Sequence, residues 1–301
     1  MTVSWSKRSH LRPDVLLAKI EKGKRLDPSG TAAFSLFEFV DARAALETVV
    51  EIDGKLSDFA KGRIISVALS SAAAAGALTP DSLLAAMRVE LGKHRAIRPS
   101  AFILTTSLSI APTLPVKSLE LLGCEIRLLP GDFPRAFASR KAFDAQWRNA
   151  SEPEHTPSDY CKVMVSCRAR LSHDAAFVSQ EALDLFRAFA CLLENSAMSL
   201  AWSSEPGPIN KAMLGGLHAL HRGDGSLAED FYWYEPDFKK RAAHRIDAPK
   251  GSVHAKNHRW MLAQFRKTPH AIQRRLKDAL LFYVRAFDEK DRNSTLIRGC
   301  M

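Results

Sequence analysis

The sequence predicts an α+β fold with a helical N-terminal part, a small mixed sheet that has helices on one face, and a helical, basic C-terminal part. Three observations lead to this prediction. Apolar residues recur at helical spacing over residues 56–91, alternate with a period of two over residues 162–171, and return to helical spacing over residues 272–287. In the middle of the chain, a strand, a helix, a strand and a hairpin follow one another, as is typical of helices packed on a sheet.

The composition is that of a folded protein. Apolar residues occupy 46% of the 301 positions and charged residues 25%, which are ordinary values and exclude extensive disorder. We expect no membrane association, because no window is apolar enough for a spanning helix and the N-terminus lacks the apolar run of a secretory signal. The five cysteines are widely spaced without a C-x-x-C pair, so we expect reduced thiols and a cytoplasmic location.

The N-terminal region, residues 1–98, is predicted to be mainly helical. Apolar residues over 56–75 follow helical spacing and end in an alanine-rich run, whose small side chains favour close packing of helices. Thr79 and Pro80 indicate a helix start, because threonine caps the first turn and proline lacks the N–H that would have no partner there. We expect this helix to stop at Gly92.

Residues 99–250 are predicted to form an α+β core region. Residues 101–110 and 124–129 combine apolar character with alternation, which indicates strands. Residues 162–171 alternate strictly, as a half-buried strand does. The stretch 174–194 then carries an apolar stripe at three- and four-residue spacing, which predicts a helix that packs on the sheet.

A hairpin is predicted to close this region, with its turn at residues 223–225 (Gly-Asp-Gly). An aromatic run, Phe231 to Tyr234, lies in the returning arm and is expected to pack on the sheet. His218 and His221 lie in the first arm. Their three-residue spacing places the two imidazoles on opposite faces of a strand, which argues against a metal ion shared between them.

Residues 251–301 are predicted to begin a helical domain. Apolar positions from Ile272 to Phe287 form an amphipathic stripe, and such a helix needs a partner that buries the stripe. Ser294 resembles the cap of another helix, yet the sequence stops seven residues later. We therefore expect this helical domain to be incomplete at residue 301.

The positive charge is concentrated near the C-terminus. Residues 239–298 hold 16 Lys and Arg against 5 Asp and Glu, whereas the rest of the chain holds 27 against 28. A concentrated basic segment binds polyanions through phosphate neutralisation and counterion release, so we expect a nucleic-acid partner, RNA rather than DNA. The alternative is a solvated basic surface without a partner. The candidate phosphate contacts are Lys239, Lys240, Arg241, Arg245, Arg266, Lys267, Arg274 and Arg275.

One short pattern has the spacing of a ribonuclease motif. Arg168 and His173 match R-x4-H, the spacing with which HEPN ribonucleases place an arginine and a histidine near the 2′-hydroxyl and phosphate of RNA. Here the pattern falls on a predicted strand and its exit, whereas those enzymes carry it on a helix. Metal-independent cleavage by Arg168 and His173 is thus one interpretation. We expect no cofactor and no metal, because the sequence contains no G-x-S-x-G, P-loop or H-E-x-x-H pattern.

Two stretches resemble a group of bacterial proteins. The first comprises Pro208–Lys211, Leu214-Gly215, His218, Leu220-His221, Asp224-Gly225 and Trp233–Pro236, and the second is the helix from Arg275 with Asp291 and Ser294 after it. Both are similar to large bacterial proteins that join an α+β N-terminal region to a C-terminal helical domain of the HEPN type, the ApeA-like defence proteins.

This resemblance implies that the chain is the N-terminal, scaffold portion of an anti-phage or toxin-like protein. In that family the R-x4-6-H motif would fall beyond residue 301, so the resemblance implies a chain that is not catalytic on its own. A third interpretation is an interaction scaffold whose C-terminal helix docks on a second chain as a homodimer. Whether the chain is an enzyme stays open at this point.

Overall fold

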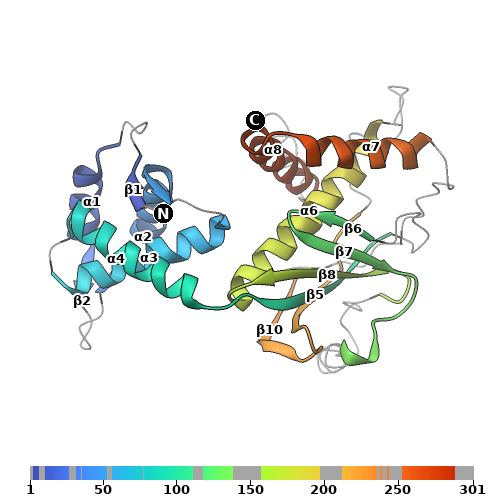
Figure 1. Ribbon diagram of the computed structural model, residues 1–301, viewed down its shortest axis with the longest axis horizontal. Helices are drawn as coiled ribbons and strands as arrows, with labels where there is room; N and C mark the ends of the chain where they lie inside the picture. The colour runs from blue at the N-terminus through green and yellow to red at the C-terminus, as the bar shows by residue number, and fades with distance from the viewer. Residues whose placement is uncertain are drawn as a thin grey trace. The chain divides into compact units, whose positions relative to one another are not determined.

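The computed structural model describes residues 3–6, 11–26, 32–34, 36–52, 56–76, 78–110, 118–137, 157–196, 212–235, 238, 243 and 253–288. Contacts divide the chain into two compact units, Met1–Pro99 and Ser100–Met301 (Figure 1). The predicted α+β class is confirmed, because the first unit is mainly helical and the second packs helices against a sheet.

The described residues of the first unit form four helices and two small antiparallel ladders. The helices are α1 (Pro13–Lys22), α2 (Leu36–Val49), α3 (Asp58–Ala74) and α4 (Pro80–Ala96). The strands pair as β1 (Val3–Trp5) with β4 (Val50–Ile52), and as β2 (Lys24–Leu26) with β3 (Ala32–Phe34). The sequence did not predict these four strands, since each spans only three residues and gives no measurable alternation.

The start of α4 is as predicted, but its end is not. The Thr79 side chain accepts a hydrogen bond from the Ser82 N–H at 3.1 Å, and the Ser82 hydroxyl accepts one from the Thr79 N–H at 2.9 Å. The helix continues past Gly92 to Ala96. Leu91 and His94 are both buried, so packing on either side of Gly92 outweighs the roughly 1 kcal/mol that a glycine costs within a helix.

The second unit is built on a six-stranded sheet with the order β10-β9-β5-β8-β7-β6. The strands are β5 (Ser100–Leu108), β6 (Ser118–Leu121), β7 (Cys124–Leu129), β8 (Cys161–Ala169), β9 (Leu217–Arg222) and β10 (Leu227–Tyr234). All pairings are antiparallel, so the expected mixed sheet is wrong. The helix α6 joins β8 to β9, and these two strands run in the same direction; β5 lies between them and pairs with both.

Helices cover one face of this sheet, as predicted (Figure 1). Val163 and Val165 of β8 point into the core between the sheet and α6 (Ser172–Ser196). Two further helices, α7 (Val253–Lys267) and α8 (His270–Asp288), pack on α6. A short 3-10 helix, η1 (Arg135–Phe137), contacts the opposite face, where Phe137 meets the ring of His221 edge-on.

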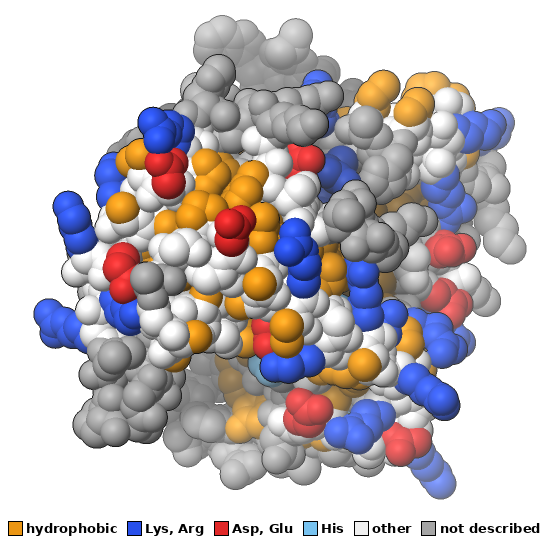
Figure 2. Space-filling view, turned by 60° about the vertical axis from the view of Figure 1, so that its left-hand side comes forward, with side chains coloured by type: hydrophobic (Ala, Val, Ile, Leu, Met, Phe, Trp, Pro, Cys, Tyr) orange, Lys and Arg blue, Asp and Glu red, His pale blue; other side chains and the backbone are white. Residues whose placement is uncertain are grey.

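Among the side chains coloured in Figure 2, positive and negative ones are interspersed and do not form a broad field of one sign. Among the helices that the structure describes, none combines the length and the apolarity that a bilayer crossing requires.

Candidate nucleic-acid interface

Helix α7 is held on the core by one face. Leu262 and Phe265 are buried, and the ring of Phe265 meets the ring of Phe189 of α6 edge-on, with 5.6 Å between the centroids. Met261 packs against the same core. These contacts fix the rotation of α7 about its axis and therefore decide which of its side chains face solvent.

The opposite face of α7 carries cations around an exposed tryptophan. Lys256, Trp260, Gln264 and Lys267 are all exposed, and their spacing of four, four and three residues places them in one row along the helix. Trp260 has 63% of its surface exposed, the largest fraction among the exposed large hydrophobic residues of the described chain. The sequence of α7 contains no acidic residue.

The C-terminal end of α7 is tied to the edge of the sheet. Arg266 donates two hydrogen bonds to the main-chain carbonyl of Glu120 on β6, at 3.1 Å from Nε and 2.5 Å from Nη2. The Thr268 N–H donates hydrogen bonds to the Gln264 and Phe265 carbonyls at the C-terminal end of the helix. Arg266 therefore has a structural contact as well as an exposed position, whereas the neighbouring Lys267 belongs to the outward row.

Two more of the cations that the sequence proposes as phosphate contacts are described, and both lie on helix α8. Arg274 and Arg275 are both exposed. The next cation, Lys277, points inward and forms a partly buried ion pair with Glu181 of α6 at 3.0 Å. The remaining four candidates, Lys239, Lys240, Arg241 and Arg245, lie outside the described residues.

The two residues of the R-x4-H pattern lie on different elements. Arg168 is exposed near the end of β8, and His173 is exposed in the first turn of α6. Arg168 lines a groove of about 780 Å³ together with Arg266, Ser166, Glu120 and other residues of β5 to β7; His173 is not among the described residues that line it. Convergence of the pair on one catalytic centre stays a prediction.

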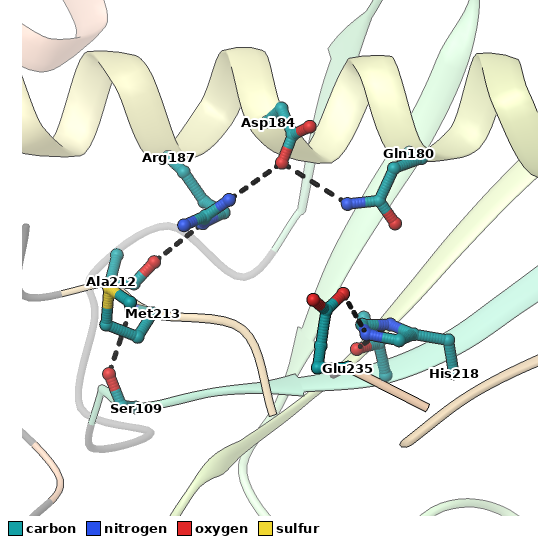
Figure 3. A network of polar contacts seen from close by, with 9 residues as sticks. Ser109, Gln180, Asp184, Arg187, Ala212, Met213, His218 and Glu235 are labelled. Carbon is teal, nitrogen blue, oxygen red and sulfur yellow. Dashed lines mark hydrogen bonds and ion pairs between the residues drawn. The ribbon is translucent and has the colours of Figure 1, made fainter. Parts of the chain in front are cut away.

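A buried polar network lies between α6 and the sheet (Figure 3). Arg187 of α6 is 1% exposed; its Nη1 donates to Asp184 at 2.8 Å and its Nε donates to the Ala212 carbonyl at 2.7 Å. Gln180 donates to the same Asp184 oxygen at 3.3 Å. These bonds pin the segment before β9 to α6, and a buried ion pair of this kind is costly to break.

The second part of Figure 3 centres on His218, which is fully buried. Its Nε2 lies 2.9 Å from a carboxylate oxygen of Glu235, and its Nδ1 lies 2.8 Å from the hydroxyl of Thr106. The ring stacks on Trp233 with 5.1 Å between the centroids. Because Nδ1 is hydrogen-bonded, Nε2 lies beside the Glu235 carboxylate and the ring is buried, we assign His218 a structural role.

The two histidines of β9 face opposite sides of the sheet, as the spacing predicts. His221 bonds to Thr105 at 3.1 Å and to the Gly225 carbonyl at 3.1 Å, whereas His218 bonds to Thr106, the next residue of β5. Successive residues of a strand point to opposite faces. Within the described ranges, no three His, Cys, Asp or Glu side chains gather as ligands for a metal ion.

Sequence reasoning found Lys267 but missed the other three members of the outward row of α7. It ranked residues by charge and passed over Trp260 and Gln264, and it also left out Lys256. The signal that finds them is the recurrence of a lysine, a tryptophan and a lysine at helical spacing in a segment without acids.

No protein-family model matches this chain, and searches among curated proteins and among solved structures find no match either.

Proposed function

We propose that this chain binds single-stranded nucleic acid on the outward row of α7, formed by Lys256, Trp260, Gln264 and Lys267. The observation that carries the proposal is the exposure of Trp260, 63% of its surface, between two exposed lysines of the same row. Aromatic side chains on which bases stack, set among cations that follow the backbone, are the recurrent means of binding single strands.

The chemistry of each side chain fits this use. Lys256 and Lys267 are eleven positions apart, about 16 Å along a helix, so that a strand of several nucleotides contacts both. The indole of Trp260 lies between them and offers a stacking surface to any base. Gln264 adds an amide that donates and accepts hydrogen bonds, as a base edge or a sugar hydroxyl requires.

The biological setting proposed here follows from the sequence resemblance. The chain is a scaffold portion of a HEPN-type bacterial defence protein, it works in the cytoplasm, and RNA is its ligand rather than DNA. The cysteines that the structure describes, Cys124, Cys161, Cys167 and Cys191, are free and buried, which supports a reducing compartment. Burial raises the pKa of the Cys161 thiol to about 11, so this thiol stays protonated and unreactive at neutral pH.

The experiment is a titration of a fluorescently labelled, single-stranded RNA oligonucleotide, followed by anisotropy between about 50 and 200 mM salt. Trp260→Ala should weaken binding roughly tenfold with an unchanged salt slope, because a stacked base contributes about 1–3 kcal/mol. Lys256→Gln/Lys267→Gln should weaken binding and flatten the slope by about 1.4, since each phosphate contact on a single strand contributes about 0.7.

The matched control replaces two exposed lysines of another helix. Lys19→Gln/Lys22→Gln in α1 removes the same charge and should leave the affinity within about twofold if the contacts are local. A DNA oligonucleotide of the same sequence tests the RNA preference. Equal binding by the wild type, Trp260→Ala and the α7 lysine variant would refute the proposed site.

A second candidate function is RNA cleavage by Arg168 and His173. The observation that favours it is that Arg168 shares its groove with Arg266, which belongs to the proposed binding helix. Incubation of labelled RNA with the chain in the absence of added metal, beside Arg168→Ala/His173→Ala, decides between the two. Cleavage that disappears in the double variant establishes a ribonuclease; binding without cleavage leaves the scaffold.

A further inference from the structure

Helix α8 has an apolar stripe on the face that points to solvent. Ile272 is 57% exposed, Leu276 40% and Phe282 45%, and Ala279 between them is also exposed. Their spacing of four, three and three residues places them on one side of the helix. Surface hydrophobic residues are common singly, but an aligned set on one helix marks an interaction surface.

The stripe is not the face by which α8 packs on the core of its own chain, because a different face makes that contact. Leu280, Leu281 and Val284 are buried in the core, and Lys277 is paired with Glu181 of α6 at 3.0 Å. The rotation of α8 is therefore fixed and the helix is apolar on two sides. A helix on the surface of a monomer needs only one apolar face.

We propose that a second copy of this chain covers the stripe, with the two α8 helices antiparallel about a two-fold axis near position 277. In a two-fold interface, residue i meets residue j while j meets i. This register brings Phe282 onto the partner's Ile272 and Leu276 onto the partner's Ala279, whose small side chain allows close approach. The same register sets Arg275 beside the partner's Asp278.

The charges favour a second copy over a polyanion on this face. Arg275 lies within the row of the stripe, three residues after Ile272 and four before Ala279, and Asp278 flanks it with the opposite sign. The Asp278 side chain is 61% exposed and lies 3.7 Å from the ammonium of Lys277 on the same helix. An antiparallel copy pairs each arginine with the partner's aspartate, and both pairs form at once. Nucleic acid would instead meet the Asp278 carboxylate, and Phe282 is the single member of the stripe on which a base could stack. Arg275 is thereby reassigned from phosphate binding to helix pairing.

The interface is small. Nineteen residues of helix extend about 28 Å, and a single helix pair lies at the low end of the interface sizes known for specific complexes. We therefore expect reversible dimerisation that depends on concentration, to be followed by sedimentation velocity of the full chain from about 1 to 100 µM. The wild type should shift from monomer to dimer over this range.

The polar variant Leu276→Gln/Phe282→Gln tests the apolar contact without adding charge. It should weaken dimerisation at least tenfold, because it places amides against the partner's apolar side chains. Val89→Gln on α4 is the control, since Val89 is also 57% exposed and should not change the dimerisation. Circular dichroism melting verifies that each variant folds.

Charge reversal tests the register. Arg275→Asp and Asp278→Arg each set like charges against one another, so each should weaken dimerisation about tenfold or more, and the double variant should return to within about threefold of the wild type. A wild type that stays monomeric at every concentration overturns the proposal. A dimer unaffected by the Leu276 and Phe282 changes overturns it equally, and a double variant without recovery rejects the antiparallel register.

Discussion

Helices α7 and α8 are neighbours in sequence and both rest on α6, yet their outward faces are chemically different. α7 turns Lys256, Trp260 and Lys267 to solvent, in a helix whose sequence has no acid. α8 turns Ile272 and Phe282 to solvent, with Arg275 in the same row and Asp278, of opposite sign, beside it. Both helices lie in the basic C-terminal segment and each holds more Lys and Arg than Asp and Glu, so the sign of their total charge does not distinguish them.

The buried face of a helix decides which of its charged side chains face solvent and can bind a partner. In α7 the contact of Phe265 with Phe189 turns the row of lysines outward. In α8 the ion pair of Lys277 with Glu181 takes one cation inward and leaves the apolar stripe outside. We therefore propose a polyanion as the partner of α7 and a second copy of the chain as the partner of α8.

The largest effect is expected from a change in helix α6, on which both α7 and α8 pack. Arg187→Leu leaves the Asp184 carboxylate buried without its cation, and breaking a buried pair in this way costs about 3–5 kcal/mol. Urea unfolding followed by tryptophan fluorescence measures the loss. RNA binding and dimerisation should then both be lost, since α7 and α8 both pack on α6.

The double variant Asp184→Leu/Arg187→Leu is the matched control. It removes both charges at once and should be clearly more stable than Arg187→Leu alone, because apolar pairs often replace buried ion pairs at little cost. A single variant as stable as the wild type would show that the pair does not anchor α6.

The next effect separates the two faces of α7. Phe265→Ala should cost about 3 kcal/mol, since it empties a buried ring site, whereas Trp260→Ala should change stability by less than about 0.5 kcal/mol. The same unfolding titration measures both. If Trp260→Ala destabilises the chain as much as Phe265→Ala, the indole is a packing residue and the binding row loses its central member.

A smaller effect is expected where α8 meets α6. Glu181→Ala removes the nearer carboxylate from the ammonium of Lys277, whose side chain is 12% exposed, and leaves it with Asp278 at 3.7 Å, which should cost about 1–3 kcal/mol. Glu181→Ala/Lys277→Met should recover most of that loss. Thermal melts of the wild type, of Glu181→Ala and of the double variant measure these changes in stability. A double variant no more stable than Glu181→Ala would argue against coupling of these two side chains.

Much of the fold follows from sequence patterns, because burial imposes periodicity. The alternation of Val163 and Val165 predicted β8, and the stripe with Phe186 and Phe189 predicted α6, within a few residues of their ends. The strand order did not follow. The placement of β5 between β8 and β9 is a long-range contact that local spacing does not encode, which is why a mixed sheet was expected.

The candidate site was predicted less well than the fold. Counting cations found the basic segment but could not separate Lys267, which faces outward, from Arg266, which bonds to Glu120, because that distinction depends on helix rotation. Trp260 was overlooked, because the candidate contacts were chosen by charge alone. The HEPN-type resemblance and the pairing of Arg168 with His173 stay predictions.

The most direct test of the account measures both activities on the same two variants. Affinity for a short RNA oligonucleotide and the monomer–dimer equilibrium are determined for Trp260→Ala and for Leu276→Gln/Phe282→Gln. The account predicts that the first variant loses RNA affinity and dimerises normally, and that the second stays monomeric and binds RNA as the wild type does. Variants that each lose both activities, or neither, would contradict the division of roles between α7 and α8.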